Sequence, residues 1–95
     1  NLEAAVAADP QLWDAQNALG MCYALQGDVR AARAKFAEIL AADPNNTEAL
    51  LNEGILFHQE KDYENARARF SQVLEIDPRH QRARSFLKQL DRKQP

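Results

Sequence analysis

The chain has 95 residues, 45% hydrophobic and 27% charged, which fits one globular domain and excludes an intrinsically disordered chain. The net charge is −2, but residues 1–60 carry 3 basic and 9 acidic side chains and residues 61–95 carry 9 and 5, so we expect an acidic end and a basic end. No apolar run approaches the roughly 18 residues of a membrane-spanning helix, and the single cysteine, Cys22, excludes an internal disulfide.

The sequence repeats itself at an interval of 34 residues, which is typical of a repeat architecture. The stretch "AEILAADPNN" at 37–46 returns as "SQVLEIDPRH" at 71–80, and "EAAVAADPQL" stands one interval earlier at 3–12. Residues 1–8 carry apolar side chains at the places that a second helix uses one interval later. We therefore expect 1–8 to be the remnant second helix of a preceding repeat, and the chain to be the C-terminal part of a longer array.

Residues 13–46 and 47–80 predict two repeats of two helices each. Within a repeat, apolar and small side chains follow the i, i+3, i+4, i+7 spacing of one helix face. In the first repeat the two stripes are Gln16, Leu19, Gly20 and Tyr23, then Val29, Ala32, Phe36, Ile39 and Leu40. A 34-residue shift places Gly54, Phe57, Ala66, Phe70 and Val73 at matching positions of the second repeat.

Turn signals separate these helices. Gly27 suits a left-handed helix end and Asp28 suits the N-cap of the helix that follows. In the second repeat Lys61 takes the place of Gly27, which predicts a slightly strained turn. After each second helix the dipeptide "DP" ends the helix, and Asn45 and Asn46 can cap the next one.

Two glycines inside the first helices require a tertiary explanation. Gly20 and Gly54 each cost about 1 kcal/mol of helix stability relative to alanine. Small residues, Ala32 and Ala66, stand at the corresponding level of the second helices. We expect close antiparallel packing of the two helices to offset the cost.

Residues 81–93 predict a terminal capping helix. An apolar stripe continues through Ala83, Phe86, Leu87 and Leu90. However, Lys88 occupies the place of Gly20 and Gly54, and Asp91 that of Tyr23, so another helix cannot approach closely. A polar terminal helix of this kind keeps a stack of repeats soluble.

These motifs resemble the tetratricopeptide repeat, whose unit is about 34 residues. The resemblance is carried by Leu19-Gly20-x-x-Tyr23, Ala32-x-x-x-Phe36 and Pro44, then by Gly54-x-x-Phe57, Ala66-x-x-x-Phe70 and Pro78. It implies an all-α fold over 1–95, a right-handed α-solenoid of antiparallel helix hairpins with a capping helix. The chain departs from the family at the preferred tryptophan, where Gln16 and Leu50 stand, and at Glu53. Trp13 is expected to staple the start of its helix instead.

No sequence pattern indicates catalysis. His58 and His80 have no cysteine partner at metal-ligand spacing, and there is no HExxH, glycine-rich phosphate loop or G-x-S-x-G. We interpret His80 as a turn residue. The sequence therefore predicts a non-enzymatic module without a cofactor or a metal.

The resemblance implies instead a protein-binding scaffold, whose concave groove is lined by successive first helices. The face one residue out of phase with the core stripe carries the candidate peptide-binding residues, which are Asn17, Met21 and Ala24, and in the second repeat Leu51, Ile55 and His58. The alternative is that Met21 and Ile55 only pack between repeats.

Some family members hold the C-terminal carboxylate of a partner peptide with lysines, arginines and asparagines. Only Asn52 and Arg82 match such a clamp in this sequence. The apolar candidates favour an amphipathic helix or an extended apolar segment as the partner, with hydrogen bonds from Asn17, Asn52 and His58.

Two other classes of function compete with peptide binding. The first is structural: a homo-oligomer, or an assembly module of a larger complex such as secretion or pilus-assembly machinery, formed through an exposed N-terminal helix face. The second is nucleic-acid binding by "RHQRARSFLKQLDRK" at 79–93. No aromatic platform accompanies these arginines, so a solvated capping helix is the preferred interpretation.

Overall fold

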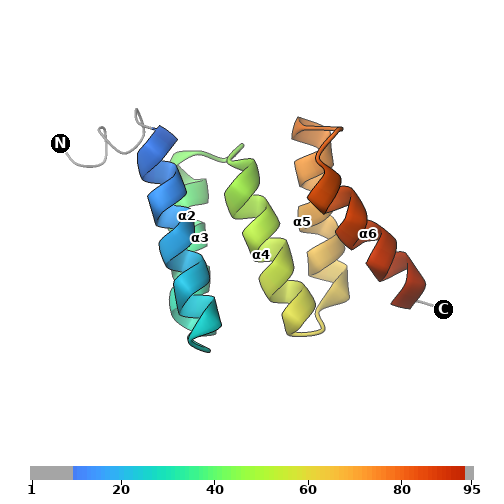
Figure 1. The fold of residues 1–95 in the computed structure, drawn as a ribbon, viewed down its shortest axis with the longest axis horizontal. Coiled ribbons are helices and arrows are strands. Elements are labelled where there is room, and N and C mark those ends of the chain that lie inside the picture. Colours follow the sequence, from blue (N-terminus) through green and yellow to red (C-terminus); the bar gives the residue numbers. More distant parts are fainter. Residues whose placement is uncertain (1–9, 94–95) are drawn as a thin grey trace.

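The computed structural model describes residues 10–93, and every secondary-structure element in this range is an α-helix (Figure 1). The helices are α2 (Pro10–Leu25), α3 (Val29–Ala42), α4 (Thr47–Gln59), α5 (Tyr63–Ile76) and α6 (Gln81–Lys93). The predicted all-α fold is confirmed. The expected helix within 1–8 lies outside the described residues.

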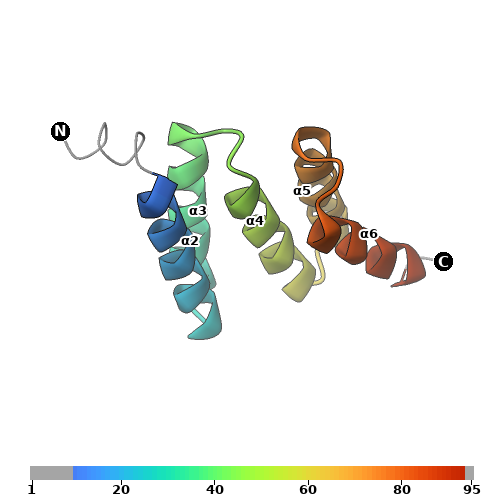
Figure 2. The ribbon, with the colours of Figure 1, turned by 45° about the horizontal axis from the view of Figure 1, so that its top comes forward.

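The helices are arranged in two layers (Figures 1 and 2). Successive helices run in opposite directions, with α2, α4 and α6 in one layer and α3 and α5 in the other. The molecule measures 17 Å along its shortest axis, which fits two layers of helices packed 8–10 Å apart. Each first helix therefore has one side against the second layer and one side free.

The helix starts are capped by side chains. Asp28, Asn46, Asp62 and His80 each accept a hydrogen bond from the backbone N–H three residues further on, at 3.1, 2.9, 3.4 and 3.3 Å. The prediction for Asp28 is confirmed, and Asn46 is the asparagine that caps α4. His80 is more than a turn residue, since its Nδ1 caps α6.

The two helix-ending turns adopt the same left-handed backbone with different residues. Gly27 has φ of 85° and Lys61 has φ of 65°. A side chain at such a φ clashes with its own backbone, which glycine avoids. The expected strain at Lys61 is therefore present.

Both helical glycines are contact points between the two helices of a repeat. A Cβ built on Gly54 would stand 2.6 Å from Cε1 of Phe70, and Gly20 faces Phe36 in the same way. The close approach is as predicted, although the partners are the phenylalanine rings. The rings and the alanines one turn before them have no exposed surface.

Glu53, the departure from the repeat pattern in α4, has a structural partner. Its Oε1 accepts a hydrogen bond from Nε of Arg69 on α5 at 2.7 Å, and 13% of the Glu53 side chain is exposed. The charge that replaces Leu19 of the first repeat is thus neutralised within the second repeat.

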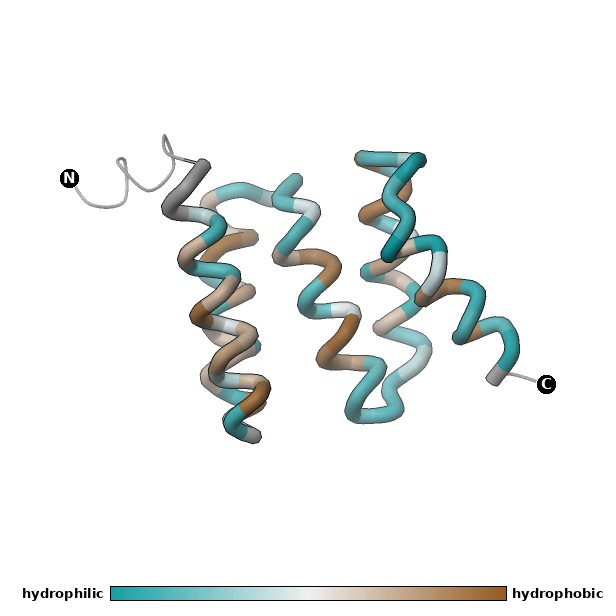
Figure 3. The backbone as a smooth tube through the Cα atoms, viewed as in Figure 1, coloured by the Kyte–Doolittle hydropathy of each residue, from teal (hydrophilic) through white to brown (hydrophobic). Residues whose placement is uncertain are grey.

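Helix α6 differs from α2 and α4 on its outer side. It buries Ala83 and Leu90, whereas hydrophilic residues dominate the rest of the helix (Figure 3). Lys88 and Asp91 are exposed, and Oδ1 of Asp91 accepts a hydrogen bond from Nη1 of Arg67 at 2.7 Å. The expected polar outer face is therefore present.

Candidate functional site

Equivalent residues one interval apart fall into rows across α2, α4 and α6. One row is Asp14, Glu48 and Arg82, and another is Met21, Ile55 and Gln89. Residues seven apart in a helix share a face, so Asp14 and Met21 lie on the same side of α2. We call this side of the three helices the first-helix surface. It carries Asp14, Met21, Ala24, Leu25, Glu48, His58 and Arg82.

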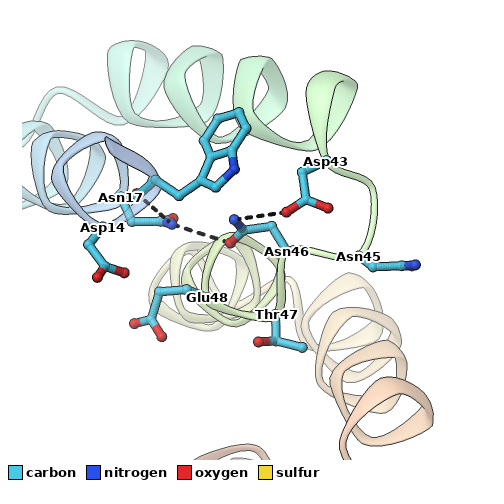
Figure 4. Close-up of a pocket in the computed structure, with 8 residues that line it drawn as sticks. Asp14, Asn17, Asp43, Asn45, Asn46, Thr47 and Glu48 are labelled. Atoms are coloured by element: carbon cyan, nitrogen blue, oxygen red, sulfur yellow. Dashed lines mark hydrogen bonds between the residues drawn. The ribbon is translucent and has the colours of Figure 1, made fainter. Parts of the chain in front are cut away.

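A depression of about 510 Å³ lies where α2 and α4 begin (Figure 4). Its lining is Trp13, Asp14, Asn17, Asp43, Asn45, Asn46, Thr47 and Glu48. The lining combines three carboxylates with three amides and one aromatic ring, and it contains no basic side chain. This part of the first-helix surface is acidic.

A network of buried amides forms the floor beside this depression. Asn17 and Asn52 are each only 3% exposed. Nδ2 of Asn17 donates to the carbonyl of Trp13 at 3.1 Å and to Oδ1 of Asn46 at 3.3 Å, while Oδ1 of Asn17 accepts from Nδ2 of Asn52 at 3.3 Å. These asparagines therefore fix α2 against α4, and both polar atoms of the Asn17 side chain are occupied within the chain.

The apolar candidate residues differ in accessibility. Leu51 has no exposed surface and Ile55 is 9% exposed, and both belong to the core cluster around Phe70. Met21 and Ala24 are partly exposed and pack against the cluster around Phe36. Ile55 is thus packed into the core, as the alternative expects for it, and Leu51 is buried with it, whereas Met21 and Ala24 keep exposed surface.

His58 lies in a group of aromatic rings. Its ring centroid is 5.5 Å from that of Tyr63 and 6.1 Å from that of Phe86, both in edge-to-face arrangement. Phe86 in turn stacks on Phe70, with centroids 4.8 Å apart. His58 is half-buried, so the rings hold its orientation while one part of it stays on the first-helix surface.

Arg82 stands at the start of α6, next to α4. Its Nη1 is 3.9 Å from Oε1 of Glu48, and 61% of the Arg82 side chain is exposed. With Gln81, Ser85, Phe86 and Gln89 it lines a second depression of about 330 Å³. Arg82 and Asn52 are not combined into one site for a carboxylate, because Asn52 is buried against α2.

Sequence reasoning missed three members of the first-helix surface, which are Asp14, Leu25 and Glu48. Leu25 is 81% exposed, the most exposed of the large apolar side chains in the described range. The sequence does contain a signal for two of them, because Asp14 and Glu48 are 34 residues apart and carry the same charge at equivalent positions of the two repeats. Leu25 is signalled by its position four residues after Met21.

The other side of α2 carries a second exposed apolar stripe. Ala15, Leu19 and Cys22 are exposed, and Leu19 retains 39% of its surface. Their equivalents in α4 include Ala49 and Leu56, which are 0% and 1% exposed because α3 covers them. On α2 the same positions have no such cover within the described residues.

Neither a metal-ligand cluster nor a membrane-spanning helix is found in the described part of the chain. No group of three or more histidine, cysteine, aspartate or glutamate side chains in residues 10–93 is arranged to hold a metal ion. None of the helices α2 to α6 is long and apolar enough to cross a membrane.

Comparison with known proteins identifies one family. A family model described as tetratricopeptide repeat matches residues 1–47 and 26–80. No curated protein matches the sequence. Repeats of this family generally serve in protein–protein interaction and are not catalytic.

Proposed function

Because the chain belongs to the tetratricopeptide repeat family, we propose that it binds a segment of a partner protein on its first-helix surface, and that it carries out no catalysis itself. The proposal is supported above all by Leu25, whose side chain is 81% exposed next to the partly exposed Met21 and Ala24. Apolar side chains gathered on one helix face and left accessible are typical of an interaction site.

The test replaces accessible residues of this surface. Met21→Arg and Leu25→Arg should abolish binding of the partner, because each puts a charge where an apolar side chain would be desolvated. Ile76→Arg is the matched control, since Ile76 is 41% exposed on α5, in the other layer. Ile55 is unsuitable as a target because its burial would make an arginine destabilise the fold.

Partners are captured from an extract with the wild-type chain. The affinity of the captured segment is then measured by titration against the wild-type chain and each variant. Circular dichroism of each variant shows whether the helices are retained. Unchanged affinity of a folded Met21→Arg, Leu25→Arg double variant would remove the first-helix surface as the binding site.

A second candidate function is assembly through the outer side of α2. It is favoured by the exposure of Leu19 and Cys22, whose equivalents in α4 are covered by α3. Sedimentation velocity over a range of concentrations tests it, with Leu19→Arg as the variant. Association that weakens in Leu19→Arg would support assembly, whereas a monomer at every concentration would contradict self-association.

A further inference from the structure

We infer that the segment bound on the first-helix surface is extended and basic, with a lysine or arginine between Asp14 and Glu48 and an apolar side chain on Met21 and Leu25. This inference rests on the proposed function and adds the chemistry of the partner. It follows from the order of charge and apolar surface along α2, and from the geometry of the depression shared with α4.

The charges at the start of α2 and α4 are complementary to a cation. Asp14 is exposed and makes no ion pair or side-chain hydrogen bond within residues 10–93. Glu48 is about half exposed, with Arg82 at 3.9 Å, a separation at which the attraction is weak in water. In Figure 4 the carboxylates of Asp14 and Glu48 point to the same side of the depression.

The amides in the floor of the depression are already hydrogen-bonded within the chain. The amide N–H groups of Asn17 and Asn46 already donate to Trp13, Asn46 and Asp43. Oδ1 of Asn46 is occupied by the N–H of Ala49 and by Asn17. A cationic side chain therefore finds the carboxylate of Asp14, unpaired within the described residues, and the weakly paired carboxylate of Glu48 on a fixed base, which favours charge-assisted hydrogen bonds.

The apolar part lies a defined distance further along the same helix. Met21 follows Asp14 by seven residues, which at 1.5 Å per residue is about 10 Å. An extended segment covers this distance in about three residues, at roughly 3.3 Å each. The cation and the apolar anchor of the partner are thus expected about three residues apart.

The shape of the surface favours an extended segment over a helix. Leu51 and Ile55 of α4 are buried in the cluster around Phe70, so the apolar side chains left accessible form a strip only one helix face wide along α2. A helix with its side chains is about 10–12 Å wide and would leave most of its circumference in water. An extended chain places alternate side chains on the surface and needs less depth.

The experiment selects ligands from a random-peptide display library with the wild-type chain, and keeps the peptides that the Met21→Arg variant does not bind. These should carry lysine or arginine about three residues from an apolar side chain. The same selection on Asp14→Arg should enrich aspartate or glutamate at that place. Glu75→Arg is the matched control, an exposed carboxylate on α5 that undergoes the same change of charge.

Binding constants of the selected peptides complete the test. Replacing the basic residue by glutamine should weaken binding to wild type by roughly fivefold, the upper range for one exposed ion pair, and should weaken binding to Asp14→Asn by less, because only Glu48 then remains. Added salt should reduce the difference.

The possible failures are distinguishable. Peptides that depend on Met21 but show no basic residue, or keep it on Asp14→Arg, would overturn this inference and leave the proposed function standing. If the basic and the apolar residue of the selected peptides stood seven residues apart, the bound segment would be a helix and the extended conformation would be wrong. Enrichment of no peptide, or of peptides indifferent to Met21→Arg, would contradict the proposed function as well.

Discussion

The ring of Phe36 lies against the backbone of Gly20 so closely that a Cβ at that glycine would stand 2.5 Å from Cε1 and 2.7 Å from Cζ. Carbon atoms that are not bonded need about 3.5 Å or more between them. Any side chain at position 20 would therefore clash with the Phe36 ring in its present place, and only glycine avoids this clash. The equivalent residues of the second repeat, Gly54 and Phe70, make the same close contact between α4 and α5.

The first prediction concerns Gly54→Ala. Alanine is the better helix former by about 1 kcal/mol, but overpacking against a fixed ring costs typically 1–3 kcal/mol. We expect the free energy of unfolding to fall by roughly 1 kcal/mol, as measured by urea denaturation. Adding Phe70→Leu should remove the additional cost of the alanine. A more stable Gly54→Ala protein would show that the ring moves away freely.

The second prediction concerns the two left-handed turns. Lys61 holds φ of 65° at a cost of about 1 kcal/mol that glycine does not bear, so Lys61→Gly should stabilise the chain by roughly 0.5–1 kcal/mol. Gly27→Lys is the reverse substitution at the equivalent turn and should lower the free energy of unfolding by a similar amount. Thermal unfolding of both variants checks the pair, and a loss of stability in Lys61→Gly would contradict the assignment of strain.

The third prediction concerns the buried amides. Asn17 takes part in three hydrogen bonds and Asn52 in one. Removing a partner from a buried polar group costs about 1–3 kcal/mol. We expect Asn17→Ala to lower the free energy of unfolding more than Asn52→Ala does. Equal effects in denaturant titrations would mean that water replaces the lost partners.

The fourth prediction separates surface from core among the apolar residues of the first helices. Leu25→Arg should change the free energy of unfolding by no more than about 0.5 kcal/mol, because the side chain is 81% exposed. Ile55→Arg should cost several kcal/mol, because its charge would enter the cluster around Phe70. Chemical denaturation of both proteins compares them directly. Similar stabilities would show that Ile55 is accessible after all.

The recurrence of residues at a fixed interval was sufficient to predict the helices, the cap at Asp28 and the close contact at Gly20. Each of these depends on local backbone chemistry or on a face that repeats with helical period. The contact of Gly20 with a ring was not predicted, since a small residue at the same level, Ala32, explained the glycine equally well.

The site was harder to predict because neighbouring faces of a helix differ by one residue. The sequence pattern predicts that Asn17 forms hydrogen bonds with a partner, whereas in the structure its amide is bonded to Asn46 and Asn52. Its equivalent in the second repeat is the buried Leu51, which marks the position as a boundary between surface and core. Whether a polar side chain there turns inward depends on the partner amides of other helices, which a single helix pattern does not contain.

The outer face of α6 carries charge where the outer faces of the earlier first helices carry small or aromatic residues. A hairpin appended after Lys93 would meet the ammonium group of Lys88 and the carboxylate of Asp91, where α2 offers Gly20 and Tyr23. Grafting glycine and tyrosine onto those two positions would create a new acceptor face for engineered repeats. Left unchanged, these two charges disfavour close packing of another hairpin against that face of α6.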